Sequence, residues 1–341
     1  MTIKIFPLFI SGIIAYLLVA LVATRYSTPS SGPLVVKRFQ ALPAAGSKIS
    51  LVTWNLGYGG LGAKSDFKAD GGKTYLPPSQ NYVRDNLRAI KKVIGKLDAC
   101  VFLFQEVATS SPINYWVDVD QGISEQLAAF DKVRDLDVAT VFLPPPLKVA
   151  HGNTIFSSFK IEAARRQVLP LEQEWHAGVL RKKYSIQIAR IPIAGSKAQW
   201  VIANVHLAAF DEGGAVRLKQ LESVQRWADK EYQHGNFVIV GGDWNLEFSK
   251  DTFPHTTDYK HRFWLYDFPF KKLLPGWQVA FDPSKPTVRT LHQPYVRGKN
   301  YVTVIDGFLV SPNLTIEAVE TINTDFENTD HQPVVARFQR K

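Results

Sequence analysis

The sequence predicts a mixed α/β fold, and three observations support this. Short runs of apolar and β-branched residues, typical of buried strands, recur along most of the chain. Two longer segments, 81–97 and 214–232, instead place apolar residues every three or four positions, as amphipathic helices do. Several strand-like runs end in Asn, Asp, Glu or His, and open α/β sheets carry their chemistry at strand ends.

Composition narrows the class of protein. The chain has 341 residues, 45% of them apolar, which is enough for a large core, and it contains no visible repeat. Its 40 Lys and Arg against 31 Asp and Glu give a net charge of +9. Such a charge favours an anionic partner, whether nucleic acid, phospholipid headgroups or a phosphorylated small molecule. The single cysteine, Cys100, excludes a disulfide within one chain and excludes cysteine-based zinc or iron–sulfur sites.

The N-terminus predicts a membrane segment. Residues Ile5 to Ala23 carry no charge, and a helix of this length would span about 28 Å, close to the bilayer core. We expect residues 1–25 to form a transmembrane anchor, with a cleaved signal peptide as the alternative. Residues 26–47 are rich in Ser, Pro, Gly and Ala and predict a linker. A catalytic domain, 48–341, follows; we expect it outside the cytoplasm, or secreted or periplasmic if the segment is cleaved.

The first strands of this domain end in an amide and a carboxylate. The run 49–55 alternates like a strand and ends in Asn55, before a loop rich in glycine. After the helix at 81–97, the apolar run 99–104 leads into Glu106. Burying a carboxylate at the end of an apolar strand is costly unless it binds a partner, and a metal ion would serve. We expect a short helix at 124–130 and a strand at 138–142.

The middle of the chain continues this alternation. We expect strands at 153–159, 184–191 and 200–206, the last ending in His206. That histidine is either a satisfied buried imidazole or a residue of the site. After the helix at 214–232, a buried strand runs into Gly241-Gly242-Asp243-Trp244-Asn245. Asp243 could take a proton from water and Asn245 could orient that water, although an Asx-rich turn is the alternative.

The last third places two more acids at strand ends. Residues 248–286 have weak periodicity and predict loops and short helices. A strand at 303–310 is interrupted by Asp306, whose carboxylate must be paired if it is buried. Strands at 315–322 and 334–338 follow, and Asp330 and His331 stand just before the second.

The order of these motifs along the chain resembles that of the endonuclease/exonuclease/phosphatase superfamily. This superfamily includes DNase I-like nucleases, sphingomyelinases and inositol polyphosphate phosphatases. The resemblance covers residues 49–339. The matching pieces are Thr-Trp-Asn-Leu at 53–56, Phe-Gln-Glu-Val at 104–107, Asn-Val-His-Leu at 204–207, Gly-Gly-Asp-Trp-Asn at 241–245, Ile-Asp-Gly-Phe at 305–308 and Thr-Asp-His-Gln-Pro at 329–333.

The resemblance implies a fold and a chemistry. The fold would be a DNase I-like four-layer α/β/β/α sandwich, here preceded by one N-terminal transmembrane helix. The reaction would be hydrolysis at phosphorus by in-line attack of water, assisted by Mg²⁺ or Mn²⁺. Glu106 would be the principal metal ligand, with Asn55 and Asp330 completing or orienting the metal's surroundings, because such ions prefer oxygen ligands.

The remaining motif residues receive catalytic roles from the same resemblance. Asp243 would be the general base and Asn245 would position the water or a phosphate oxygen. His331, paired with Asp306, would be a cation facing the charge that develops on the phosphoryl oxygens. His206 would contact the phosphate or assist the leaving oxygen. We also expect Asn153 to contact the substrate.

The substrate is left open by the sequence. Neither the arginine-rich motif of inositol phosphatases nor a clear nuclease-specific DNA-binding loop is present, and Thr329 stands where many members have Ser. The expected partners are therefore a lipid headgroup, a small phosphate ester or nucleic acid, and a membrane through the N-terminal helix, with no protein partner. An extracytoplasmic nuclease is one alternative, and a catalytically silent protein that binds anions is another.

Overall fold

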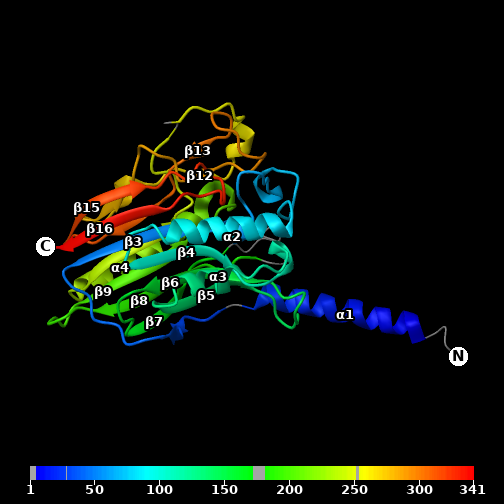
Figure 1. Cartoon of the computed structure of the whole chain (residues 1–341), viewed down its shortest axis with the longest axis horizontal. Coiled ribbons are helices and arrows are strands. Elements are labelled where there is room, and N and C mark those ends of the chain that lie inside the picture. The colour runs from blue at the N-terminus through cyan, green and yellow to red at the C-terminus, as the bar shows by residue number, and fades with distance from the viewer. Residues whose placement is uncertain (1–4, 28, 172–180, 251–252) are drawn as a thin grey trace.

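The computed structural model describes residues 5–27, 29–171, 181–250 and 253–341, with side chains from residue 10 onward apart from residue 212. Two large sheets of seven strands each form its body (Figure 1). We call them the β4 sheet and the β9 sheet. The β4 sheet has the order β15 (Leu314–Thr321), β16 (Val334–Arg340), β3 (Lys48–Asn55), β4 (Val101–Ala108), β6 (Ala150–Ser157), β5 (Asp131–Ala139) and β2 (Val36–Lys37).

The β9 sheet contains the strands of the second half of the domain together with one short N-terminal strand. Its order is β1 (Gly32–Pro33), β7 (Ala163–Val168), β8 (Ser185–Pro192), β9 (Gln199–His206), β10 (Phe237–Asp243), β14 (Asp306–Val310) and β11 (Gln278–Ala280). A separate two-stranded ribbon pairs β12 (Val288–Arg289) with β13 (Val302–Thr303).

Three hydrophobic clusters hold four layers together. The central cluster packs the two sheets face to face, through residues such as Leu103 of β4 and Ile202 of β9. A second cluster joins the outer face of the β9 sheet to α4 (Ala215–Gln233). The third joins the outer face of the β4 sheet to α2 (Gln80–Ile94) and α3 (Val119–Gln126). The predicted mixed α/β fold, with its two amphipathic helices at α2 and α4, is confirmed.

The direction of the strands brings the predicted site residues to one edge. Strand β3 is parallel to β4, and β9 is parallel to β10. The carboxyl ends of each parallel pair therefore lie side by side, and Asp243 stands opposite both His206 and Asp306 in the register of the β9 sheet. Because the sheets face each other, one end of the sandwich collects polar side chains from both.

Three predicted elements were misplaced. The helix expected at 124–130 runs from 119 to 126, and the strand expected at 138–142 runs from 131 to 139. Most of strand β5 was missed because it contains five charged residues, among them Lys132, whose ammonium pairs with Asp120, and Asp135, whose carboxylate pairs with Arg166. Such buried pairs hide the apolar alternation. The strand expected at 303–310 is interrupted, with β13 ending before residue 304 and β14 beginning at Asp306.

The helix α1 (Ile5–Tyr26) projects away from the body, while the chain that follows it runs along the sheets (Figure 1). The stretch predicted as a linker supplies β2, which pairs with β5, and β1, which pairs with β7. Ala45 from the same stretch is fully buried in the central cluster. Within the described part of the chain, no helix has both the length and the hydropathy needed to cross a membrane.

Candidate active site

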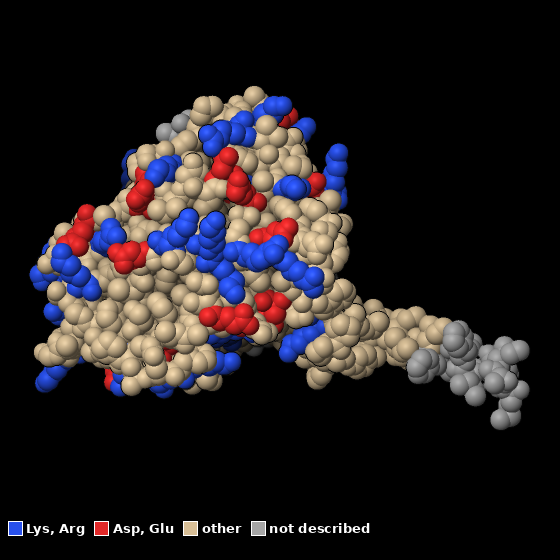
Figure 2. Space-filling model, in the orientation of Figure 1, with Lys and Arg blue, Asp and Glu red and all other residues tan. Residues whose placement is uncertain are grey.

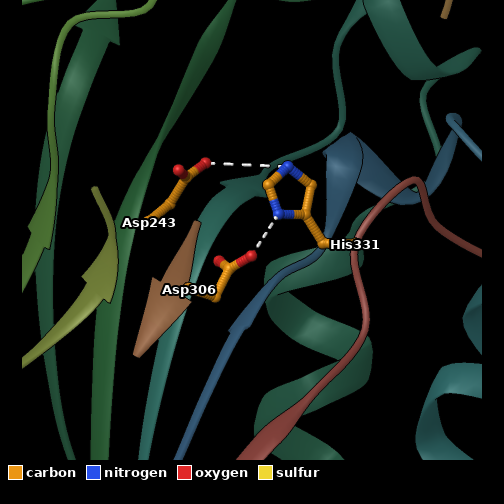
Figure 3. A group of neighbouring side chains, drawn as sticks. All are labelled: Asp243, Asp306 and His331. Atoms are coloured by element: carbon orange, nitrogen blue, oxygen red, sulfur yellow. Dashed lines mark hydrogen bonds and ion pairs between the residues drawn. The ribbon is translucent and has the colours of Figure 1, made fainter. Parts of the chain in front are cut away.

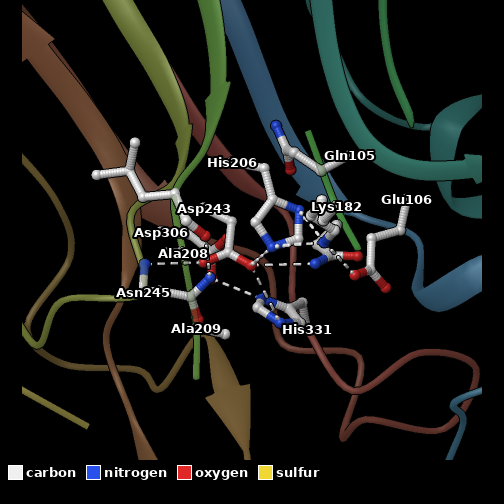
Figure 4. Close-up of polar contacts among 12 residues, drawn as sticks. Gln105, Glu106, Lys182, His206, Ala208, Ala209, Asp243, Asn245, Asp306 and His331 are labelled. Atoms are coloured by element: carbon white, nitrogen blue, oxygen red, sulfur yellow. Dashed lines mark hydrogen bonds and ion pairs between the residues drawn. The ribbon is translucent and has the colours of Figure 1, made fainter. Parts of the chain in front are cut away.

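A cavity of about 530 Å³ opens at the end of the sandwich where the strands terminate. Residues of both sheets line it, so that acids, amides and imidazoles from distant parts of the sequence face one space (Figure 4). Among the predicted site residues, Asn55, Glu106, His206, Asp243, Asn245, Asp330 and His331 all line this cavity. Asp306 lies behind His331 and is fully buried.

Asp243 is fixed by the turn that follows β10. At Gly242, a Cβ would lie 1.9 Å from the Val205 carbonyl oxygen, so only glycine allows β10 to approach β9 this closely. The Asp243 carboxylate then accepts hydrogen bonds from the Asn55 side chain (3.0 Å) and from the backbone N–H of Asn245 (3.0 Å). Burial raises the pKa of Asp243 to about 7. A carboxylate with such a pKa suits a general base near neutral pH.

His331 is held between two carboxylates (Figure 3). Its Nδ1 lies 2.9 Å from Asp306 Oδ2, and its Nε2 lies 3.6 Å from Asp243 Oδ2. Burial alone would lower the pKa of His331, but the charges of Asp306 and Asp243 outweigh it and raise the pKa to about 10. The imidazole is therefore a cation at neutral pH, placed where it can stabilise negative charge on a substrate.

His206 has the opposite character although it lies close by. Its Nε2 is 3.4 Å from Asp243 Oδ2, and the Lys182 ammonium lies 3.3 Å from both ring nitrogens. Burial, with the charge of Lys182 as the second cause, lowers the pKa of His206 well below its ordinary value. The site thus contains one charged and one neutral imidazole, and the neutral one can donate or accept a hydrogen bond at a substrate oxygen.

Glu106 owes its position to a bulge in β4. The register between β4 and β6 shifts between Phe104 and Val107, and Glu106 takes a left-handed backbone conformation with φ of 55°. Its Oε1 accepts hydrogen bonds from the Tyr58 hydroxyl (2.8 Å) and from Lys182 (3.1 Å). Because of the bulge, the Glu106 side chain points into the cavity and does not follow the regular alternation of side chains along β4.

Asp330 faces the same side of the cavity as Glu106. Gly57 makes room for it, because a Cβ at that position would lie 2.6 Å from Asp330 Oδ1. Burial raises the pKa of Asp330, and the charge of Glu106 raises it further, while His331 opposes both. Two acids that repel each other in one buried space are stabilised by a cation.

The donor set on this side fits a hard divalent ion. Glu106 and Asp330 offer carboxylate oxygens and Asn55 an amide oxygen, which are the ligand types Mg²⁺ and Mn²⁺ prefer. A second group, Asp243, Asp306 and His331, also brings its ligand atoms within 4.8 Å of one another. We favour the first set, because Nδ1 of His331 is already bonded to Asp306 and its Nε2 faces Asp243 as an ion-pair partner.

Asn153 lies elsewhere. It is buried in β6 opposite Asp135, its backbone carbonyl accepts a hydrogen bond from Gln187 (3.3 Å), and it is not among the residues that line the cavity. The sequence reasoning also missed several polar residues that do line it, among them Tyr58, Asp70, Lys182 and Arg289. The basic run 181–183 and the polar loop 66–72 were the only signals for two of them.

Neither a protein-family model nor a curated protein matches the chain. Solved structures do match. An endonuclease/exonuclease/phosphatase from Beutenbergia cavernae superposes with a TM-score of 0.55 at 18% identity, over 86% of this chain and 72% of that one.

The chain has the fold of endonuclease/exonuclease/phosphatase proteins. A second member, from Bacteroides vulgatus, matches with a TM-score of 0.54 at 13% identity, over 86% of this chain and 99% of that one. TDP2 from D. rerio, in a complex with a single-strand DNA product, gives a TM-score of 0.54 at 15% identity, over 86% and 99%. The resemblance inferred from the motifs is thus supported at the level of the fold.

Proposed function

We propose that this protein is a divalent-metal-dependent phosphoesterase that hydrolyses a phosphate ester or phosphodiester by in-line attack of water. The observation that carries the proposal is the arrangement around Asp243. This buried carboxylate, with a pKa near 7, lies within 3.6 Å of an imidazolium and is held by two amides. A base and a cation that face one cavity from the same side are what attack of water on a phosphoryl group requires.

Each residue then has a defined task. Asp243 removes the proton of the attacking water. The imidazolium of His331, kept charged and oriented by Asp306, stabilises the phosphoryl oxygens, and His206 and Asn245 position the substrate. Glu106, Asn55 and Asp330 would hold Mg²⁺ or Mn²⁺, which when bound supplies Lewis-acid stabilisation and charge neutralisation. Asn153, which does not line the cavity, would affect substrate binding only indirectly.

The direct test is turnover of bis(p-nitrophenyl) phosphate and p-nitrophenyl phosphate by the full chain. We expect magnesium-dependent release of nitrophenol that is abolished by a chelator and by Asp243→Asn. Wild-type protein that binds these compounds without hydrolysing either of them would instead identify a catalytically silent anion-binding protein.

A nuclease is the second candidate, because TDP2, the neighbour from D. rerio, binds a DNA product and this chain has a net charge of +9. Plasmid nicking measured against salt distinguishes the two. A polyanion backbone bound by several cations releases counterions, so KM for DNA should rise steeply with salt. Efficient nicking with such a slope would establish a nuclease, and absence of nicking by protein that hydrolyses a small ester would exclude it.

We also propose that the chain is tethered to a membrane by residues 1–25, with the catalytic domain outside the cytoplasm. The basis is the uncharged run 5–23 in the sequence. Protease added to intact cells, after any outer barrier is permeabilised, should remove the domain. Complete protection would place the domain on the cytoplasmic side, and a mature protein that begins near Thr24 would show cleavage instead.

A further inference from the structure

The base of helix α1 lies beside the active site. The backbone N–H of Val141, just beyond β5, donates a hydrogen bond to Thr24 Oγ1 (2.8 Å). The ammonium of Lys183 binds the Thr24 carbonyl (2.8 Å) and the Ser27 hydroxyl (2.6 Å). The neighbouring residue, Lys182, reaches Glu106 in the cavity. Figure 1 shows the helix leaving the body near β5. Since β5 runs parallel to β4, the carboxyl end of β5 lies at the end of the sandwich where Glu106 lines the cavity.

The described part of α1 exposes apolar side chains on all sides. Large apolar residues at 10, 13, 14, 16, 18, 19 and 22 are each more than two-fifths exposed. At about 100° per residue, their directions leave no gap wider than about 60° around the helix axis. In Figure 2, the described part of this projection shows no charged side chain on its visible face. A helix that is apolar all round is typical of lipid surroundings, whereas a single partner helix would require only one stripe.

The body presents more exposed apolar side chains at the same end, and we call them the apolar rim. They are Tyr75, Leu76, Trp116, Phe142 and Leu147, between 43% and 71% exposed. The rim is continuous with the helix, since the Tyr16 hydroxyl binds the Phe142 carbonyl, and the Trp116 indole binds the Pro146 carbonyl (2.7 Å).

The rim is also continuous with the cavity. Tyr75 and Leu76 line a small hollow together with Tyr58, Leu61 and Phe67, and these last three residues also line the main cavity. The exposed lysines 64, 68 and 73 lie on the neighbouring loop, and Lys148 follows the rim residue Leu147. Large aromatic and aliphatic side chains next to lysines are typical of surfaces that enter the headgroup region of a bilayer.

We propose that the apolar rim and the adjoining helix enter one phospholipid surface, so that the mouth of the cavity faces the lipid and the substrate is a phosphodiester headgroup in that surface. This inference rests on the proposed function for its chemistry, but the docking of the rim does not depend on catalysis. An exposed patch of this kind that adjoins an active site marks an interaction surface. The helix that is apolar on all sides identifies the partner as lipid rather than protein.

The docking is tested with full-length protein in vesicles of equal parts phosphatidylcholine and phosphatidylglycerol, with and without bromine on the acyl chains. Trp116 is one of eight tryptophans, so its signal is the difference between the wild type and Trp116→Phe. We expect brominated lipid to quench this difference signal. Equal signals in the two kinds of vesicle would overturn the proposal, as would a protein dimer that disappears on Phe142→Ser.

The substrate class is tested with a matched pair of variants. Phe142→Ser with Leu147→Ser removes part of the rim. Phe39→Ser is the control, because Phe39 is comparably exposed and follows directly after β2. Strand β2 pairs with the start of β5, so Phe39 lies at the end of the sandwich opposite the cavity. We expect the rim variant to lower hydrolysis of vesicle phospholipid at least about tenfold, as the loss of two apolar anchors implies. Turnover of soluble bis(p-nitrophenyl) phosphate should stay unchanged in both variants.

The two readouts separate the two proposals. Absence of wild-type turnover on every ester, with Trp116 still quenched, would defeat the proposed function and leave the lipid docking standing. Turnover of the soluble diester without hydrolysis of vesicle lipid, or equal loss in the rim and Phe39 variants, would defeat the lipid substrate and leave the phosphoesterase standing.

Discussion

The two sides of the cavity satisfy their acids differently. On the side of the β9 sheet, Asp243 is bonded to two amides and lies beside two histidines, and Asp306 is paired with His331. On the side of the β4 sheet, Glu106 has a tyrosine and one lysine, and Asp330 accepts a hydrogen bond from the Thr329 hydroxyl (3.3 Å), while the charge of Arg289 opposes the rise in its pKa that burial causes. We call the first side balanced, because His331 lies between its two acids, and the second side unbalanced, because the charge of Glu106 helps to raise the pKa of Asp330 and the proposed metal ion would offset that repulsion.

The largest effect should come from the unbalanced side. We expect Glu106→Gln to lower kcat about a thousandfold or more, because metal-based stabilisation contributes several kcal/mol. Turnover with and without a chelator measures this. Glu125→Gln is the control, since it alters only exposed contacts, a solvated pair with Lys91 and a hydrogen bond from Gln121. A Glu106 variant that keeps full magnesium-dependent activity would disprove its role in binding the metal.

Substitutions on the balanced side should lower kcat by a smaller factor. Asp243→Asn and His331→Ala should each lower kcat at least about a hundredfold, which is typical for loss of a general base or of a charge that stabilises the transition state. Thermal unfolding should confirm that both variants fold. Asp98→Asn, at a carboxylate that is 92% exposed, provides the control. Near-normal kcat in either folded variant would remove the corresponding assignment.

Two matched glycine substitutions test whether Asp330, on the side of the β4 sheet, binds the metal. Gly57 and Gly195 both have positive φ, 50° and 72°, so alanine at either position should cost about 1 to 2 kcal/mol of stability. Only at Gly57 would the new Cβ meet Asp330 Oδ1, whereas nothing lies within 4 Å at Gly195. We therefore expect Gly57→Ala, and not Gly195→Ala, to weaken Mn²⁺ binding measured by calorimetry. Equal affinities would show that Asp330 does not contact the metal.

The smallest expected effect is a shift in the pH dependence of kcat when the balanced side is altered. The base must be deprotonated, and burial raises the pKa of Asp243 to about 7, so kcat should fall as the pH drops through that value. The charge of His331 opposes this shift. His331→Ala should therefore move the acidic limb of the residual activity to higher pH, while His234→Ala, at an exposed position, should not. An unmoved limb in the His331 variant would assign it to another group.

The sequence predicted the strand ends well because chemistry and local pattern coincide there. A β-branched run that ends in Gly-Gly-Asp-Trp-Asn reveals both the strand and its functional turn. The sequence could not reveal Lys182, because this lysine reaches the site from a segment that carries no motif. Nor could it reveal the bulge in β4 that turns the Glu106 side chain toward the cavity. The sequence also contained no sign of the role of Gln105, whose side-chain amide donates a hydrogen bond to Asn204 of the other sheet (2.7 Å). This contact depends on how the two sheets pack together.

The short strands β1 and β2 have a mechanical consequence. They attach the chain after α1 to the edges of both sheets, where a flexible linker would instead have given the domain reach that grows with the square root of its length. The domain therefore has less reach around the helix than a free linker of residues 32–47 would give it. With α1 and the apolar rim in the proposed lipid surface, the catalyst would encounter substrates that diffuse laterally past the mouth of its cavity, so its rate would follow their surface density and not their bulk concentration.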